Sequence, residues 1–157
     1  LNGYNLALSR RCSGFDSPSD RHLFMNEAVI VLLSLSYSLI LGIIVAQVIL
    51  TAPVVFKVLD NENASKFLRA IFPRYYLLIF LICLLALLIS YLWFSTLDIW
   101  IAVTASILAF MGFIIIPLTN SARDRGWDKV FKFLHNFSVL NTIILFVIAI
   151  VQLIRIS

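Results

Sequence analysis

Four long apolar runs alternate with shorter polar stretches along the chain. The runs cover residues 28–52, 76–94, 99–118 and 137–154. A helix needs about 20 residues to cross the roughly 30 Å hydrocarbon core of a bilayer, and each run is about that long. None of the runs alternates apolar and polar residues as barrel strands do, and lipid offers no partner to unpaired backbone groups. The pattern therefore predicts an all-α integral membrane four-helix bundle.

The connection between the first two runs is amphipathic. From Asn61 onward, the aromatic and aliphatic side chains fall on one side of a helix, and Lys66 and Arg69 fall elsewhere. Pro73 is expected to end this helix, because the residue before a proline avoids the helical region. We predict a short amphipathic interfacial helix between spans one and two, with Lys66, Arg69 and Arg74 near lipid headgroups. A capping loop without lipid preference is the alternative.

Residues 1–24 are polar and show no periodic pattern. We expect them to be a disordered or non-native tail, with Met25 as the natural start of a single four-helix transmembrane domain at residues 25–157. A cleaved signal peptide is not expected, because the first apolar run is much longer than a signal core of roughly 7–15 residues.

The distribution of charged residues predicts how the bundle is oriented in the membrane. Only 13% of residues are charged, whereas a soluble domain has about 25%. The net charge of +4 comes from basic residues that lie next to the apolar runs, so membrane topology explains it better than nucleic-acid binding. The first and third connections carry most of these residues. The positive-inside rule therefore places both connections in the cytoplasm and both termini outside it.

In this orientation, nearly all uncharged polar groups that enter the membrane do so from the cytoplasmic side. We call this set the cytoplasmic polar cluster, and its members are Gln47, Pro53, Tyr75, Asn120, Arg123, His135, Ser138 and Asn141. Polar side chains at such depth normally face other helices. We interpret the cluster either as interhelical hydrogen bonds made by Asn141 and Gln47, or as a pocket that contacts a ligand.

Few residues suit catalysis or metal binding. Histidine can relay protons or ligate haem, but no second histidine or acid accompanies His135 inside the runs. We therefore interpret His135 as a residue that caps the fourth helix or forms a hydrogen bond to a neighbouring group, rather than as a proton relay or a haem ligand. Cys12 and Cys83 form no CxxC pair, and Asp98 is interpreted as a turn residue at the outer surface. The sequence predicts no catalytic residue, no metal site and no cofactor.

Several short motifs carry a resemblance to a known family. They are Ala52-Pro53-x-x-Phe56, Phe72-Pro73-x-Tyr75, Asn120-x-x-Arg123 and Leu134-His135-x-x-Ser138-x-x-Asn141. Over residues 25–154 the chain resembles the bacterial domain-of-unknown-function family 4149, which is related to the eukaryotic transmembrane-protein-205-like proteins. The resemblance implies a four-helix protein of the bacterial inner membrane without established activity. A looser similarity connects such bundles to copper-resistance proteins and to haem-associated protoporphyrinogen oxidases, which have more histidines than this chain.

Together, these features predict a non-enzymatic inner-membrane protein. We expect it to bind a lipid, a hydrophobic small molecule or a partner subunit at the cytoplasmic polar cluster. The expected partners are the bilayer and a homo-oligomer or another membrane protein, with no nucleic acid. One alternative is a transporter or channel component, which would have to be oligomeric because four spans leave little room for a solute path. A further alternative is a haem- or metal-linked redox protein centred on His135.

Overall fold

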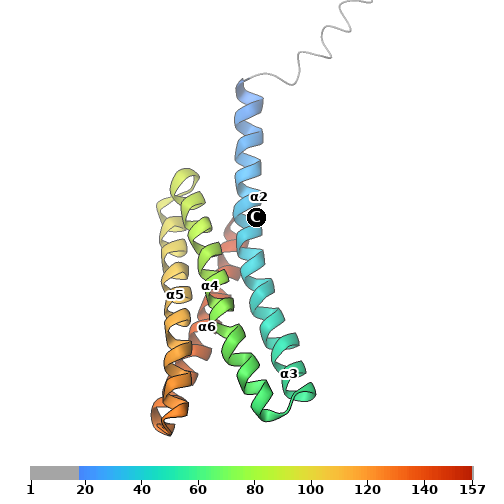
Figure 1. The fold of residues 1–157 in the computed structure, drawn as a ribbon. Helices are drawn as coiled ribbons and strands as arrows, with labels where there is room; N and C mark the ends of the chain where they lie inside the picture. Colours follow the sequence, from blue (N-terminus) through green and yellow to red (C-terminus); the bar gives the residue numbers. More distant parts are fainter. Residues whose placement is uncertain (1–17, 157) are drawn as a thin grey trace, which may run out of the picture. The chain divides into compact units, whose positions relative to one another are not determined.

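The computed structural model describes residues 18–156, in which every regular element is a helix. The elements are α2 (Pro18–Val45), η1 (Ala46–Thr51), α3 (Ala52–Val58), α4 (Asn61–Trp93), α5 (Thr96–Asp124) and α6 (Asp128–Ile156) (Figure 1). Four stretches are long and apolar enough to span a membrane, namely Asn26–Val58, Asn61–Trp93, Thr96–Asp124 and Asp128–Ile156. The prediction of an all-α four-helix membrane bundle is confirmed.

The chain divides into two units, residues 1–32 and residues 33–157. The described part of the first unit, residues 18–32, is helical. Most of the predicted polar tail, residues 1–17, lies outside the described residues, and α2 begins at Pro18, ten residues before the predicted span. The four-helix bundle belongs to the second unit.

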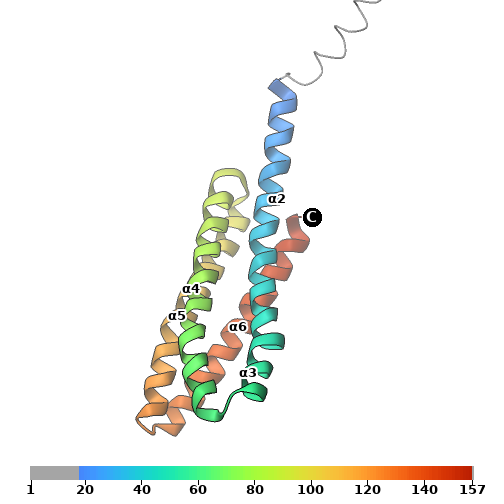
Figure 2. The ribbon, with the colours of Figure 1, turned by 45° about the vertical axis from the view of Figure 1, so that its right-hand side comes forward.

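Short turns join the helices of the second unit. The α3–α4 turn and the α5–α6 turn lie at one end of this unit, and the α4–α5 turn lies at the other (Figures 1 and 2). Asp60 caps α4 by accepting the backbone N–H of Asn63 at 3.3 Å, and hydrogen bonds from Asn63 lower the pKa of this carboxyl. Gly126 follows α5 with a φ of 68°, a conformation that glycine adopts without strain. The two connections that carry most of the basic residues are therefore at the same end.

The helix that begins after Asp60 does not stop at Pro73. It continues as α4 to Trp93, so the prediction of a separate interfacial helix is wrong. Proline lacks an N–H and its ring pushes nearby carbonyls of the preceding turn out of the hydrogen-bond ladder. Pro73 therefore leaves the Arg69 carbonyl without its helical donor, while the Arg74 guanidinium donates to the next carbonyl, that of Ala70, at 2.7 Å. A continuous helix keeps the other backbone groups paired, as a membrane requires.

The first span changes from an α-helix to a π-helix ahead of Pro53. In η1 the N–H of Ala52 donates to the carbonyl of Gln47, five residues earlier. The hydroxyl of Thr51 donates to the Ala46 carbonyl at 3.2 Å. Pro53 itself has no N–H, so the carbonyl of Ile49 four residues earlier receives no backbone donor from it. Local changes of helix type and kinks are frequent beside prolines. Gln47 is the buried residue of this segment.

Small residues are frequent at the helix contacts of the second unit, where they lie beside larger buried side chains such as Tyr37 and Leu145. Alanines at the helix contacts are buried, namely Ala64, Ala86, Ala102, Ala105, Ala109, Ala122 and Ala149. Large aliphatic and aromatic residues dominate the outer surface, and only 28–33% of each apolar window is buried. Small residues let helix backbones approach closely in lipid, where the bilayer covers the outer apolar surface. The arrangement is that of a membrane protein rather than a water-soluble bundle.

Tyr76 and Gly112 bring three helices together. A Cβ atom at Gly112 would overlap the aromatic ring of Tyr76, so the ring fits against α5 only because residue 112 is a glycine. The Tyr76 hydroxyl then reaches α6, where it lies 2.5 Å from the Thr142 hydroxyl. One side chain of α4 therefore contacts α5 and bonds to α6.

We predict that Gly112→Ala destabilises the bundle by about 1–3 kcal/mol, because the added methyl group overpacks this contact. Gly42→Ala is the matched control, since nothing lies within 4 Å of the position that its Cβ would occupy. Thermal unfolding of both variants in the same detergent measures the difference. A Gly112→Ala melting temperature equal to that of Gly42→Ala would show that the contact is unimportant.

Candidate functional site

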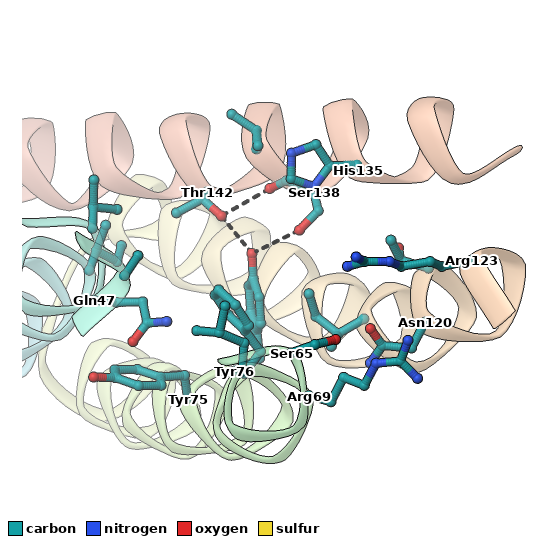
Figure 3. A pocket seen from close by; sticks show the side chains of 18 of the residues that line it. Gln47, Ser65, Arg69, Tyr75, Tyr76, Asn120, Arg123, His135, Ser138 and Thr142 are labelled. Carbon is teal, nitrogen blue, oxygen red and sulfur yellow. Dashed lines mark hydrogen bonds between the residues drawn. The ribbon is translucent and has the colours of Figure 1, made fainter. Parts of the chain in front are cut away.

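A cavity of about 910 Å³ lies within the second unit, between η1, α3 and the three following helices (Figure 3). Much of its wall is apolar, and includes Ile44, Val48, Phe72, Ile79, Phe131 and Ile143. The polar side chains in the wall are Gln47, Asn61, Ser65, Arg69, Tyr75, Tyr76, Thr119, Asn120, Arg123, His135, Ser138 and Thr142. A hollow of this size, mostly apolar with a few convergent polar groups, is typical of a binding site for a small molecule.

Six of the eight residues of the cytoplasmic polar cluster line this cavity. They are Gln47, Tyr75, Asn120, Arg123, His135 and Ser138. The other two do not. Pro53 is exposed on α3, and Asn141 is buried against α5, where its Nδ2 donates to the Leu108 carbonyl at 3.0 Å. The predicted convergence of polar groups is present for the six, and a functional role for them stays a prediction.

Gln47 and Asn141 differ in the hydrogen bonds that their side-chain amides form. Asn141 makes the interhelical hydrogen bond that we predicted for it, with the backbone of α5. Gln47 is only 7% exposed, yet neither its Nε2 nor its Oε1 has a hydrogen-bond partner among the described residues. Buried polar groups are normally paired, because leaving one unpaired costs about 1–3 kcal/mol. The amide of Gln47 is turned toward the interior of the cavity in Figure 3.

Several hydroxyl groups of the cavity wall donate hydrogen bonds to other groups of the protein. Thr142 donates to the Ser138 carbonyl at 2.9 Å, so the Tyr76 hydroxyl is the donor in its 2.5 Å bond with Thr142. Thr51 donates to a carbonyl of its own helix, so Tyr75 is the donor in their 3.3 Å contact. The predicted cluster did not include Tyr76 and Thr142, although each stands next to one of its residues in the sequence.

The charged side chains gather at the end of the cavity away from Gln47 (Figure 3). Arg69 makes two bonds with the Asp124 carboxylate, of 2.8 and 2.7 Å, and joins the start of α4 to the end of α5. Arg123 makes no ion pair within 4.0 Å among the described residues, and its guanidinium lies 5.8 Å from the ring centroid of Phe131. Arg123 is therefore a cation without a matched anion in the cavity wall.

The predicted headgroup residues all have partners inside the protein. Besides the Arg69 pair, Lys66 pairs with Glu62 at 2.6 Å, and Arg74 donates to a backbone carbonyl. Asp124 thus pairs with α4 rather than within its own connection. Contact of these basic residues with lipid headgroups stays a prediction.

His135 lies inside α6, seven residues after its first residue Asp128, so it does not cap the helix. Its ring is exposed and stacks on Phe131, with the ring centroids 5.9 Å apart. In the part of the chain that the structure describes, no group of three or more His, Cys, Asp or Glu side chains could hold a metal ion. The described residues thus offer a histidine beside a cavity and no metal centre.

A second group of polar side chains holds the opposite end of the bundle. Asp98 is 6% exposed, forms a capping box with Ser95, and accepts Nε2 of Gln152 at 2.8 Å. Arg155 lies 3.5 Å from the same carboxylate oxygen. The interpretation of Asp98 as a mere turn residue is therefore wrong, because it also joins α5 to α6. A glutamine inside the fourth apolar run was the signal that such a partner was needed.

The comparisons with known proteins place the chain in a family without adding an activity. A family model described as a domain of unknown function (DUF4149) matches residues 35–128. Neither the curated proteins nor the solved structures gave a match. The resemblance noted from the short motifs is confirmed over the matched residues, and the motif that contains His135 and Ser138 lies beyond them.

We predict that Tyr76→Phe and Thr142→Val are coupled in stability. Each single substitution removes the same hydrogen bond. The double variant should therefore lose less unfolding free energy than the sum of the two single losses, with a coupling energy of about 0.5–1.5 kcal/mol. Unfolding in detergent gives the four values of the cycle. Tyr76→Phe with Thr104→Val is the control, because Thr104 bonds to the Trp100 carbonyl of its own helix and the two losses should add. Additive losses in the test pair would contradict the bond.

Proposed function

We propose that this chain, which belongs to the DUF4149 family, binds a single-chain amphipathic ligand with an anionic head in the cavity of its transmembrane bundle. The observation that carries the proposal is the unpaired cation Arg123 at one end of a largely apolar cavity of about 910 Å³. An apolar wall favours a hydrocarbon chain, and a guanidinium favours a phosphate or carboxylate.

The size of the cavity supports a ligand with one chain. Its volume of about 910 Å³ lies near the upper end of the roughly 300–1,000 Å³ that is usual for small-molecule sites. One long acyl chain with a small head suits a cavity of this size. The polar groups near Arg123, namely Asn120 and Ser65, supply further hydrogen bonds for an anionic head.

The arrangement of the helices supports entry from the bilayer. In the described residues, no Cα atom of η1 or α3 lies within 8 Å of a Cα atom of α6. η1 and α3 therefore do not close on α6 beside the cavity, whose walls these elements share. A ligand dissolved in the membrane reaches such an opening directly, which favours a lipid over a water-soluble metabolite.

We further propose that the protein lies in the bacterial inner membrane with both termini outside the cytoplasm. The supporting observation is that the α3–α4 and α5–α6 turns, beside which most basic residues lie, are at one end of the bundle. In this orientation the charged end of the cavity faces the cytoplasmic leaflet, which is rich in anionic lipid headgroups.

The orientation predicts the behaviour of a reporter at the C-terminus. Alkaline phosphatase, which folds only outside the cytoplasm, should be active when fused after Ser157. The same reporter inserted after Gly126, in the α5–α6 turn, should be inactive. The reverse pattern would contradict the proposed orientation and leave the cavity unaffected.

The proposed ligand predicts a specific effect of Arg123→Gln. Hexadecyl phosphate, a single chain with an anionic head, should bind the wild type and bind this variant about 10-fold more weakly, because a charge-assisted bond is lost. Arg125→Gln is the matched control, since Arg125 stacks at 5.0 Å on Trp127 and does not line the cavity. Native mass spectrometry in detergent measures both. Equal affinity in the two variants would contradict the proposed headgroup site.

A further inference from the structure

We infer that Gln47 determines which single-chain lipid the cavity accepts, by binding a carbonyl that has a free hydroxyl beside it. This inference rests on the proposed function, because it concerns the part of the same ligand that lies beyond the headgroup. A single-chain glycerophosphate, with an ester next to an unsubstituted hydroxyl, has this chemistry.

The first step is the state of the Gln47 amide. Gln47 is only 7% exposed, and both polar atoms of its side chain lack hydrogen-bond partners among the described residues. The other two buried amides of the bundle behave differently, since Asn141 donates to a carbonyl and Gln152 donates to Asp98. Gln47 is therefore the buried amide whose donor and acceptor are both unused in the described structure.

The second step is that several hydroxyl groups of the cavity wall are already used. The donor hydrogens of Thr51, Tyr75 and Tyr76 are each used in a bond to another group. Thr119, also in the cavity wall, donates to the Ile115 carbonyl at 2.8 Å. These four hydroxyls therefore cannot supply the donor hydrogen that the Gln47 Oε1 needs. The most economical source is a ligand in the cavity toward which the amide points (Figure 3).

The third step is the position of the amide relative to the charge. Gln47 and Arg123 lie at opposite ends of the view of the cavity, with Tyr76 between them (Figure 3). A ligand whose anionic head is at Arg123 reaches Gln47 with the part that follows the head. A carboxamide presents a donor and an acceptor side by side, so its complement presents an acceptor and a donor. An alkyl chain offers neither, and an ether oxygen or an isolated ester only accepts.

The backbone holds Gln47 in this place. It belongs to the π-helical turn that Pro53 and the Thr51 hydroxyl maintain, and the Tyr75 hydroxyl ties this turn to α4. Short π-helical segments within α-helices are frequent at functional sites, because they reorient side chains at a defined position. A small rotation of the Gln47 side chain is enough to present both amide atoms to a ligand.

The experiment compares two probes with the same head and chain length. Hexadecyl phosphate has no group beyond the phosphate, whereas 1-palmitoyl-glycerol 3-phosphate has the ester and the adjacent hydroxyl. We expect the wild type to prefer the second by on the order of 10- to 100-fold, as two extra hydrogen bonds provide. In Gln47→Leu this ratio should fall to near 1, mainly because the affinity for 1-palmitoyl-glycerol 3-phosphate falls.

Thr104→Val is the control. Its hydroxyl is bonded to the Trp100 carbonyl of its own helix and does not line the cavity, so the preference should remain. A stability measurement separates recognition from a structural role. Because Gln47→Leu removes an unpaired buried amide, its melting temperature without ligand should stay equal or rise. Gln47→Met, which keeps the length of the side chain, provides the same test if the leucine variant does not fold.

Three outcomes overturn the inference, and they differ in what else they affect. If Gln47→Leu keeps the wild-type preference, or melts well below the wild type without ligand, Gln47 is structural and the headgroup site stands. If the wild type binds both probes equally, the cavity accepts single-chain phosphates without selection. If the wild type binds neither probe, the proposed function fails together with the inference.

Discussion

The contact between the Tyr76 ring and the backbone at Gly112 determines the geometry of this bundle. It lets α4 approach α5 closely, and it directs the Tyr76 hydroxyl to Thr142 on α6. Three helices are thereby held together around one aromatic side chain. The cavity lies beside Tyr76, and among the described residues no Cα atom of η1 or α3 comes within 8 Å of a Cα atom of α6. Space for a ligand therefore remains between η1 and α3 on one side and α6 on the other.

The prolines of the spans explain why irregular backbone borders this cavity. Pro53, Pro73 and Pro117 lie beside the lining residues Ala52, Phe72 and Ile116, respectively. Each proline removes the N–H that would pair with the carbonyl four residues earlier, namely that of Ile49, Arg69 or Phe113. Side chains near the prolines donate to other carbonyls, from Thr51 to Ala46, from Arg74 to Ala70 and from Thr119 to Ile115. The helical chain nevertheless continues past each proline, and among the described helical elements η1 is the one that departs from α-helical geometry.

Hydropathy and charge were sufficient to predict the four spans and to place most polar groups at one end. They could not predict that α4 continues through Pro73, because that depends on where the Arg74 guanidinium lies in the folded chain. They could not separate Gln47 from Asn141 either. Both are amides at similar depth, and only tertiary packing decides that the carbonyl of Leu108 is within reach of Asn141. Asp98 was misinterpreted for the same reason, since its partner Gln152 lies 54 residues away.

The interhelical hydrogen bonds are distributed unevenly around the cavity. α6 is tied to α5 by the Gln152–Asp98 and Asn141–Leu108 bonds of 2.8 and 3.0 Å, and to α4 by the 2.5 Å Tyr76–Thr142 bond. η1 is joined to α4 by the longer Thr51–Tyr75 contact of 3.3 Å. The wall that carries Gln47 is therefore attached to the other helices by fewer and longer side-chain bonds than the wall formed by α6, although the Tyr75 contact still fixes its position.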